Sequence, residues 1–338
     1  MSGVFGLEVA IVSTSKSGSL GYQMMKALQG IFQPGASRQQ AKRHGRDAGL
    51  ISGISTMRCM SADVHQFARF ISARWLAVMQ LSEVRTEMAL AYIQELEQRE
   101  RSGGRIARVC ASIRKLDIAC RQVGIFPPES PALLPYKEQG GPGGYHSKPK
   151  PVSYTQEEAQ AIIAYITSQD PIVARLLRLM WAAGLRIREA TWLRVQDIDL
   201  EHGVISLNRE GNVNRTKGGK PRTFSYSPEA QDFMTDLTNR TDIQPAGHFF
   251  ANRLGLPDRV RKIVRKACLE LNIQSQASHG YRKTFSVESY HRARSAGADD
   301  RQALLATSLK LGHNRIAVTR QSYVSSLERE KAGKADHG

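Results

Sequence analysis

Five short motifs in the second half of the chain combine cations, imidazoles and one phenol without a cluster of acids. They are Gly184-Leu185-Arg186 with Glu189, the basic stretch Thr216–Arg222 that contains Lys217, His279 with Arg282, Leu311-Gly312-His313, and Tyr323. Phosphodiester cleavage spreads negative charge over the non-bridging oxygens in its transition state, and arginine neutralises such charge with paired hydrogen bonds. Metal-dependent nucleases instead hold their ions with clustered carboxylates. The set therefore predicts phosphodiester chemistry that uses the protein's own cations.

The charge of the whole chain agrees with a phosphate-rich partner. Its 338 residues include 48 Lys+Arg and 31 Asp+Glu, a formal net charge of +17, while a 41% hydrophobic content excludes wholesale disorder. No apolar run has the length of a membrane span, and the short stretch Val9–Val12 is not typical of a signal peptide. Four cysteines without a CxxC pair exclude a disulfide scaffold or zinc ribbon. We therefore expect a cytoplasmic, nucleoid-associated protein that binds nucleic acid.

The elements that must position the motifs begin with a helical region. Residues 1–37 carry Gly and Ser with little periodicity and are predicted to be a flexible leader or arm. Residues 38–123 are predicted to form a small helical domain, because apolar residues such as Val64, Phe67 and Ile71 recur on one face of each helix. None of its residues has the pattern of a catalytic site.

A linker and a second domain follow. Residues 124–151 hold seven of the chain's thirteen prolines and the run Gly-Gly-Pro-Gly-Gly, which excludes helix and central strand and predicts a linker. Residues 152–327 are predicted to be the domain that carries all five motifs, and residues 328–338 a C-terminal tail. Helices are expected through most of this domain, with strands at Val204–Leu207 and Thr223–Tyr226 on either side of the basic stretch. The predicted fold class is mainly α with a small antiparallel β-hairpin sheet.

In this order, the motifs resemble those of the tyrosine recombinase, or phage integrase, family. That family's pattern is a Gly-Leu-Arg-x-x-Glu turn, a hairpin lysine, His-x-x-Arg, Leu-Gly-His and a tyrosine soon after, which matches residues 150–325 here. The resemblance implies a helical core-binding domain joined to an α/β catalytic domain, the two forming a C-shaped clamp around duplex DNA. It also implies a homotetramer on two DNA recombination sites that exchanges strands through a Holliday junction, with no metal ion, ATP or other cofactor.

The resemblance assigns the phosphate contacts to three residues. Arg186 and Arg282 are expected to hold the phosphate oxygens from two sides, and His313 to donate a hydrogen bond to the same group. Glu189, three residues after Arg186, is expected to brace the Arg186 turn as structural support rather than take part in the chemistry.

The proton transfers and the attack on phosphorus are assigned by the same resemblance. Tyr323 is expected to be the nucleophile, which gives a 3′-phosphotyrosyl enzyme and a free 5′-hydroxyl. His279 would assist the proton transfers, since imidazole titrates near neutral pH. Lys217 would protonate the departing 5′ oxygen and matches the family position better than Lys220, although both remain candidates.

Other functions remain open from the residues alone. A DNA-binding regulator with a decayed site, a type IB topoisomerase and a metal-dependent nuclease would each fit part of the pattern. Asp197 and Asp199 resemble a metal pair, but a helix end followed by a turn is the favoured interpretation. Among recombinase roles we favour integration of a mobile element, because the leader and the long His313–Tyr323 spacing differ from the compact chromosomal type. Resolution of cointegrates or chromosome dimers is the alternative, and accessory DNA-bending or directionality factors are possible partners.

Overall fold

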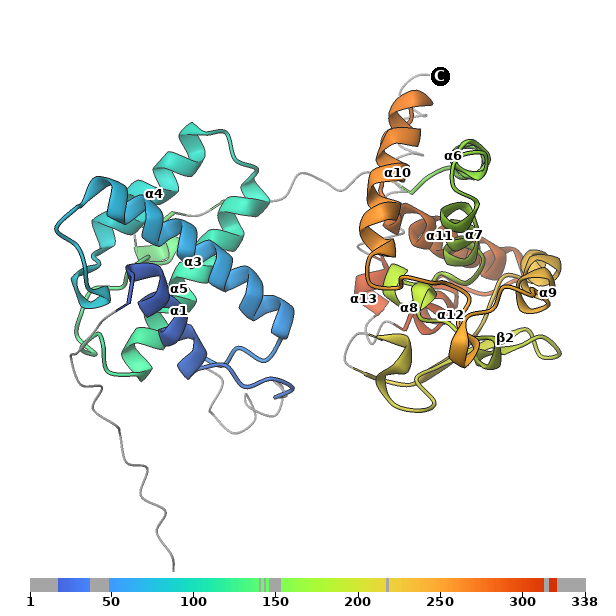
Figure 1. The fold of residues 1–338 in the computed structure, drawn as a ribbon, viewed down its shortest axis with the longest axis horizontal. Coiled ribbons are helices and arrows are strands. Elements are labelled where there is room, and N and C mark those ends of the chain that lie inside the picture. Colours follow the sequence, from blue (N-terminus) through green and yellow to red (C-terminus); the bar gives the residue numbers. More distant parts are fainter. Residues whose placement is uncertain are drawn as a thin grey trace, which may run out of the picture. The chain divides into compact units, whose positions relative to one another are not determined.

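The computed structural model describes residues 18–36, 49–139, 141–142, 144–145, 153–216, 219–312 and 316–320. These residues are mostly helical with one small antiparallel sheet, which confirms the predicted fold class. The chain divides into two compact units, Met1–Lys150 and Pro151–Gly338 (Figure 1). Among the described residues, no helix combines the length and the apolar character needed to span a bilayer.

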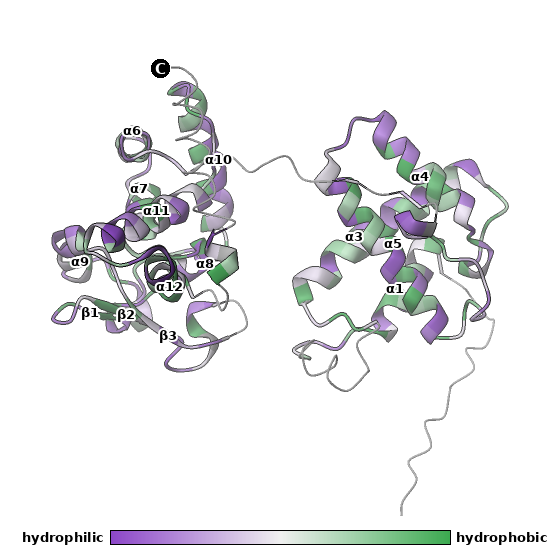
Figure 2. Ribbon diagram, turned by 180° about the vertical axis from the view of Figure 1, so that it is seen from behind, coloured by the Kyte–Doolittle hydropathy of each residue, from purple (hydrophilic) through white to green (hydrophobic). Residues whose placement is uncertain are grey.

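The first unit is a bundle of amphipathic helices. They are α1 (Leu20–Gly30), α3 (Ile54–Arg74), α4 (Thr86–Gln98) and α5 (Gly103–Gln122), with 3-10 turns η1 (Leu81–Glu83) and η2 (Lys137–Gln139). Hydrophobic and hydrophilic residues alternate along these helices (Figure 2), and the apolar faces of α1, α3 and α5 pack against one another. Burial of one face stabilises helices that would be marginal as isolated peptides.

The prediction that residues 1–37 form a flexible arm is wrong for the part that forms α1. Leu20, Met24 and Leu28 recur at four-residue intervals and are buried in the core of the first unit, where α1 packs against α3. The surrounding Gly and Ser residues obscure this short period in the sequence. The rest of the predicted arm lies outside the described residues, apart from a short stretch next to α1.

The predicted linker is also partly folded. Phe126, Leu133 and Leu134 are buried in the core of the first unit. Arg121 donates hydrogen bonds to backbone carbonyls between residues 127 and 131, and Arg114 does the same for Leu134 and residues beyond it. Prolines leave carbonyls without a regular ladder, so two guanidinium groups take the place of secondary structure. This part of the segment is therefore an extension of the first unit.

The second unit carries the site. Its helices are α6 (Gln156–Thr167), α7 (Pro171–Ala183), α8 (Ile187–Thr191), α9 (Gln231–Thr238), α10 (Leu256–Glu270), α11 (His279–Ser295), α12 (Asp300–Leu311) and α13 (Ile316–Thr319), with 3-10 turns η3 (Val195–Asp197), η4 (Asn212–Asn214), η5 (Pro228–Ala230) and η6 (Pro245–Gly247). The helix α7 packs against both α6 and α11. Its apolar side chains are buried in the largest core cluster of the unit. Elements near the two ends of α7 are therefore held at fixed positions.

The sheet has three antiparallel strands in the order β1 (Ile198–Asp199), β2 (Val204–Leu207) and β3 (Arg222–Ser225). Val204 pairs with Ser225 and Leu207 with Arg222, which confirms the predicted pairing of two strands around the basic stretch. The strand β1 was missed because it is only two residues long. Around it, Asp197 ends η3 and Asp199 accepts a hydrogen bond from the backbone N–H of His202, so the predicted helix end and turn are present.

Candidate active site

The first part of the site is the sharp turn between α7 and α8. Gly184 ends α7 with φ +58°, a left-handed conformation that suits glycine, and a Cβ here would come within 2.3 Å of the Phe285 ring. Arg186 is the N-cap residue of α8. The Glu189 carboxylate accepts hydrogen bonds from the backbone N–H of Arg186 at 2.9 Å and from its guanidinium at 2.7 Å. The spacing of these residues therefore forms a helix stop, a turn and a capped short helix.

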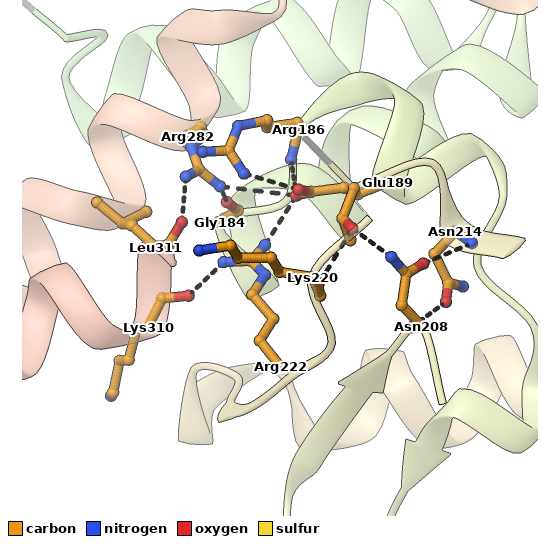
Figure 3. Close-up of polar contacts among 11 residues, drawn as sticks. Gly184, Arg186, Glu189, Asn208, Asn214, Lys220, Arg222, Arg282, Lys310 and Leu311 are labelled. Carbon is orange, nitrogen blue, oxygen red and sulfur yellow. Dashed lines mark hydrogen bonds and ion pairs between the residues drawn. The ribbon is translucent and has the colours of Figure 1, made fainter. Parts of the chain in front are cut away.

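Arg282 enters the same region from the first turn of α11. Its side chain is fully buried, and its guanidinium donates hydrogen bonds to the carbonyls of Gly184 and Leu311, the latter at 2.5 Å. These carbonyls lie at the C-terminal ends of α7 and α12, where the last carbonyls lack partners within the helix. Arg282 also lies 3.8 Å from the Glu189 carboxylate (Figure 3). A buried cation thus joins two helix ends that are distant in sequence.

The start of α11 is fixed by a tyrosine that precedes α6. The Tyr154 hydroxyl accepts a hydrogen bond from the backbone N–H of Gln276, and the Thr284 hydroxyl donates to the Tyr154 carbonyl. A Cβ at Gly280 would come within 2.3 Å of the Tyr154 ring, so this glycine permits the close packing. His279 begins α11 one turn before Arg282, with its side chain exposed. The spacing of three residues puts both on one face of the helix.

Glu189 is the centre of the charge cluster. Its side chain is fully buried, and it forms ion pairs with Arg186 and Arg222 at 2.7 Å as well as the longer contact with Arg282. Burial raises the pKa of the Glu189 carboxyl, but the three arginines and the Arg186 backbone N–H outweigh it and hold the pKa below its ordinary value. Three cations thus surround one anion. The excess positive charge favours the binding of a further anion, such as a phosphate group.

Arg222 is a member of this cluster that the sequence motifs do not single out. Its guanidinium donates hydrogen bonds to Glu189 at 2.7 Å and to the Lys310 carbonyl at 3.0 Å, and it stacks on the Phe224 ring at 4.5 Å. Burial lowers the pKa of this guanidinium, while Glu189 opposes the shift. Strand alternation was the available signal, since Arg222 and the buried Phe224 share one face of β3. In so basic a chain, an arginine at a strand start is not distinctive.

The basic stretch between β2 and β3 is anchored by buried amides. Asn208 and Asn214 each donate a backbone N–H to the other's side-chain oxygen, at 2.7 and 3.0 Å. The Asn208 amide donates to the Thr216 hydroxyl, which donates in turn to the Lys220 carbonyl at 3.1 Å (Figure 3). Lys217 lies outside the described residues, whereas Thr216 and Lys220 belong to this network. The root of the hairpin is therefore held by neutral hydrogen bonds.

The structure brings only some of the expected site residues together. Arg186 and Arg282 both form ion pairs with Glu189, His279 lies one helical turn from Arg282, and Lys220 closes the hairpin turn. The remaining expected residues, Lys217, His313 and Tyr323, lie outside the described part of the chain. Among the described residues, no group of three or more His, Cys, Asp or Glu is arranged to hold a metal ion.

Comparison with known proteins identifies similar sequences and folds. The pattern of the phage integrase family matches residues 153–330. The tyrosine recombinase XerC of Lactobacillus delbrueckii subsp. bulgaricus is 27% identical over 186 residues, which cover 51% of this chain and 58% of that protein. The tyrosine recombinase XerC of Anoxybacillus flavithermus is 24% identical, over 78% of this chain and 85% of the relative. The Tn1549 transposon integrase in complex with transposon right end DNA has a similar fold, with a TM-score of 0.58 and 17% identity over 93% of this chain and 99% of that one.

Proposed function

The chain belongs to the phage integrase family of tyrosine recombinases, and from this premise we propose that it is a site-specific DNA recombinase. Its substrate is duplex DNA, which the protein cuts and rejoins. The observation that carries the proposal is the cluster in which Arg186, Arg222 and Arg282 surround the buried Glu189. Such an excess of guanidinium groups suits a phosphate whose oxygens gain charge in the transition state.

The arginines of the cluster divide the work according to their exposure. The Arg186 side chain is 30% exposed, so it can contact a phosphate at the surface. Arg282 is fully buried, and its positive charge acts on the phosphate from the protein interior. The resemblance assigns Arg282 a phosphate contact as well, and His313 a hydrogen bond to the same group. The buried carboxylate of Glu189 keeps the guanidinium of Arg186 in one orientation before DNA binds. A preorganised donor of this kind stabilises the transition state without reorganisation.

The reaction transfers the phosphoryl group of the DNA to the enzyme. A bond forms between the Tyr323 oxygen and phosphorus while the bond from phosphorus to the 5′ oxygen breaks. His279 assists removal of the tyrosine proton, and Lys217 gives a proton to the 5′ oxygen. The 3′-phosphotyrosyl bond conserves the energy of the phosphodiester. The 5′-hydroxyl of a partner strand can therefore reverse the step without ATP, a metal ion or another cofactor.

The assembly and the biological role follow from the same family relation. The helical first unit serves as the core-binding domain, four protomers act on two DNA sites, and strands are exchanged through a Holliday junction. Integration of a mobile element is the role we favour, with resolution of cointegrates or chromosome dimers as the alternative. Paired sites on one plasmid and on two plasmids distinguish these roles, because a resolvase recombines the first arrangement preferentially.

The proposed activity is tested with a DNA site that traps the covalent intermediate. The site is first selected from random duplexes by binding to the protein, and is then nicked next to the scissile phosphate so that the 5′-hydroxyl fragment diffuses away. A covalent protein–DNA band on a denaturing gel is expected in the presence of EDTA, and Tyr323→Phe should abolish it while keeping DNA affinity.

Three results would contradict the proposal. Binding without any adduct would indicate a DNA-binding regulator. Relaxation of plasmids without recombinants from paired sites would indicate a topoisomerase. Loss of cleavage in EDTA would indicate a metal-dependent nuclease.

A further inference from the structure

Arg222 connects three elements of the second unit that are far apart in sequence. It starts β3, contacts Glu189 of α8 with one end of its guanidinium, and contacts the Lys310 carbonyl in the last turn of α12 with the other (Figure 3). The side chain is 13% exposed and stacks on Phe224. The two terminal guanidinium nitrogens of Arg222 therefore both donate to acceptors within the protein, one to a carboxylate and one to a carbonyl at a helix end.

The contact with Glu189 bears on the orientation of Arg186. The Oε1 atom of Glu189 accepts the Arg186 guanidinium, whereas Oε2 accepts both the Arg186 backbone N–H and the Arg222 guanidinium. Without Arg222, the buried carboxylate would have to be neutralised by Arg186 and Arg282 alone. The Oε2 atom would then lose one of its two hydrogen-bond donors, and because a buried acceptor without its partner is costly, the remaining guanidinium groups are favoured to move toward it. Those two arginines are the ones that the proposed function requires for the phosphate.

The contact with α12 bears on the turn that leads to His313. Arg222 binds the Lys310 carbonyl at 3.0 Å, next to the Leu311 carbonyl that Arg282 binds. Gly312 then ends the helix with φ +63°, and a Cβ at this position would come within 2.7 Å of the Arg222 guanidinium. Arg222 thus covers the helix end directly before His313. A cation is favourable there because the last carbonyls of a helix carry partial negative charge.

We propose that Arg222 is a positioning residue for the cleavage reaction. It keeps Glu189 from recruiting the phosphate-binding arginines, and it fixes the end of α12 from which the chain continues to His313. This inference rests on the proposed function, because it assigns Arg222 an effect on the residues that stabilise the scissile phosphate. Lysine cannot replace it fully, since a single ammonium group lacks the fork that reaches both acceptors.

The test compares two scissile groups in the full-length protein. One DNA site carries the ordinary phosphate, and a matched site carries a methylphosphonate, which is neutral and therefore carries one negative charge less than the phosphate throughout cleavage. For Arg222→Ala we expect single-turnover adduct formation on the phosphate to fall by about 100-fold, as for loss of a transition-state donor, and on the methylphosphonate by less than about 5-fold. For Arg222→Lys we expect adduct formation on the phosphate to fall by about 10-fold. On the methylphosphonate the rate of this variant should fall by a smaller factor.

The matched control is Arg259→Ala, which also removes an arginine from a buried carboxylate. Arg259 pairs with Asp170 at 2.6 Å, at the opposite end of α7 from Gly184. Its adduct formation should be lowered equally on both substrates, or not at all. Thermal unfolding of each variant identifies any that does not fold, and Arg222→Lys decides the question if Arg222→Ala is unfolded.

The outcomes separate this inference from the proposed function. If the unmodified protein forms no adduct with either substrate, both the proposed function and this inference are contradicted. If it forms the adduct, but the Arg222 variants lose equal amounts of activity on both substrates or none at all, the inference alone is overturned. A selective loss on the charged phosphate supports it.

Discussion

Two buried carboxylates, one in each unit, are neutralised in different ways. In the first unit Asp63 of α3 pairs with Arg108 of α5 at 2.8 Å and accepts a hydrogen bond from Ser112 at 2.9 Å. In the second unit the described residues place three arginines around Glu189. A one-to-one pair is typical of a structural contact between helices, whereas an excess of cations is unfavourable until an anion joins it. The difference distinguishes a contact that holds two helices together from a cluster that, under the proposed function, is suited to a phosphate.

The largest expected effect is on cleavage after removal of an arginine from the Glu189 cluster. Arg186→Ala should lower the rate of adduct formation by about 1000-fold, because a preorganised donor to the transition state is lost. DNA affinity, measured by a gel shift at fixed salt, should change little. Arg108→Ala is the matched control from the first unit and should lower the rate by less than about 3-fold in the folded protein. Equal losses for the two variants would remove the distinction between the two carboxylates.

The next effect concerns stability and its response to added anions. Glu189→Gln should lower the free energy of unfolding by about 3 kcal/mol, because buried guanidinium groups lose their counter-charge. Inorganic phosphate should restore part of this loss by binding among the arginines. Asp63→Asn should lose a similar amount of stability without any recovery. The measurement is the Tm of each variant over a series of phosphate concentrations, and an identical response of both variants would contradict the comparison.

A smaller effect is expected at the neutral anchor of the hairpin. Asn208→Ala removes the hydrogen bonds that Asn208 makes to Asn214 and Thr216, and should slow cleavage by about 10-fold through misplacement of Lys217. A DNA site with a bridging 5′-phosphorothiolate should recover most of this loss, because sulfur departs without a proton. Arg186→Ala should not be rescued by the same substrate. Rescue of neither variant would mean that Asn208 does not act through the general acid.

The smallest effect is on the acid side of the stability profile. The pKa of the Glu189 carboxyl is held below its ordinary value, so its stabilising contribution is complete above about pH 4.3 and is lost as the pH falls through the lowered pKa. The difference in unfolding free energy between the unmodified protein and Glu189→Gln should therefore shrink from about pH 5 to about pH 3. Urea unfolding at these pH values measures it. A constant difference would show that the pKa of the Glu189 carboxyl is the same in the folded and the unfolded state.

Local spacing in the sequence determined the beginnings and ends of many elements. Thr155 and Glu158 form a capping box at the start of α6, and Asp170 caps α7. Arg186 and Glu189 are three residues apart, so a short helix places them in contact whatever surrounds it. Such features depend on residues within one turn of a helix, and a single sequence contains the information they need. The net charge and the order of the five motifs likewise required no structure.

Only the tertiary structure decided how these local features meet. Arg222 reaches Glu189 across 33 residues, and Arg282 reaches Gly184 across 98 residues, which no periodic pattern specifies. The burial of α1 and of Phe126 likewise depends on surfaces supplied by distant helices. The physical reason is that a charged side chain becomes buried only where packing brings several acceptors to it at once. The chain's residue types thus determined which chemistry is available, and the packing of α7, α11, α12 and β3 determined which cations share one carboxylate.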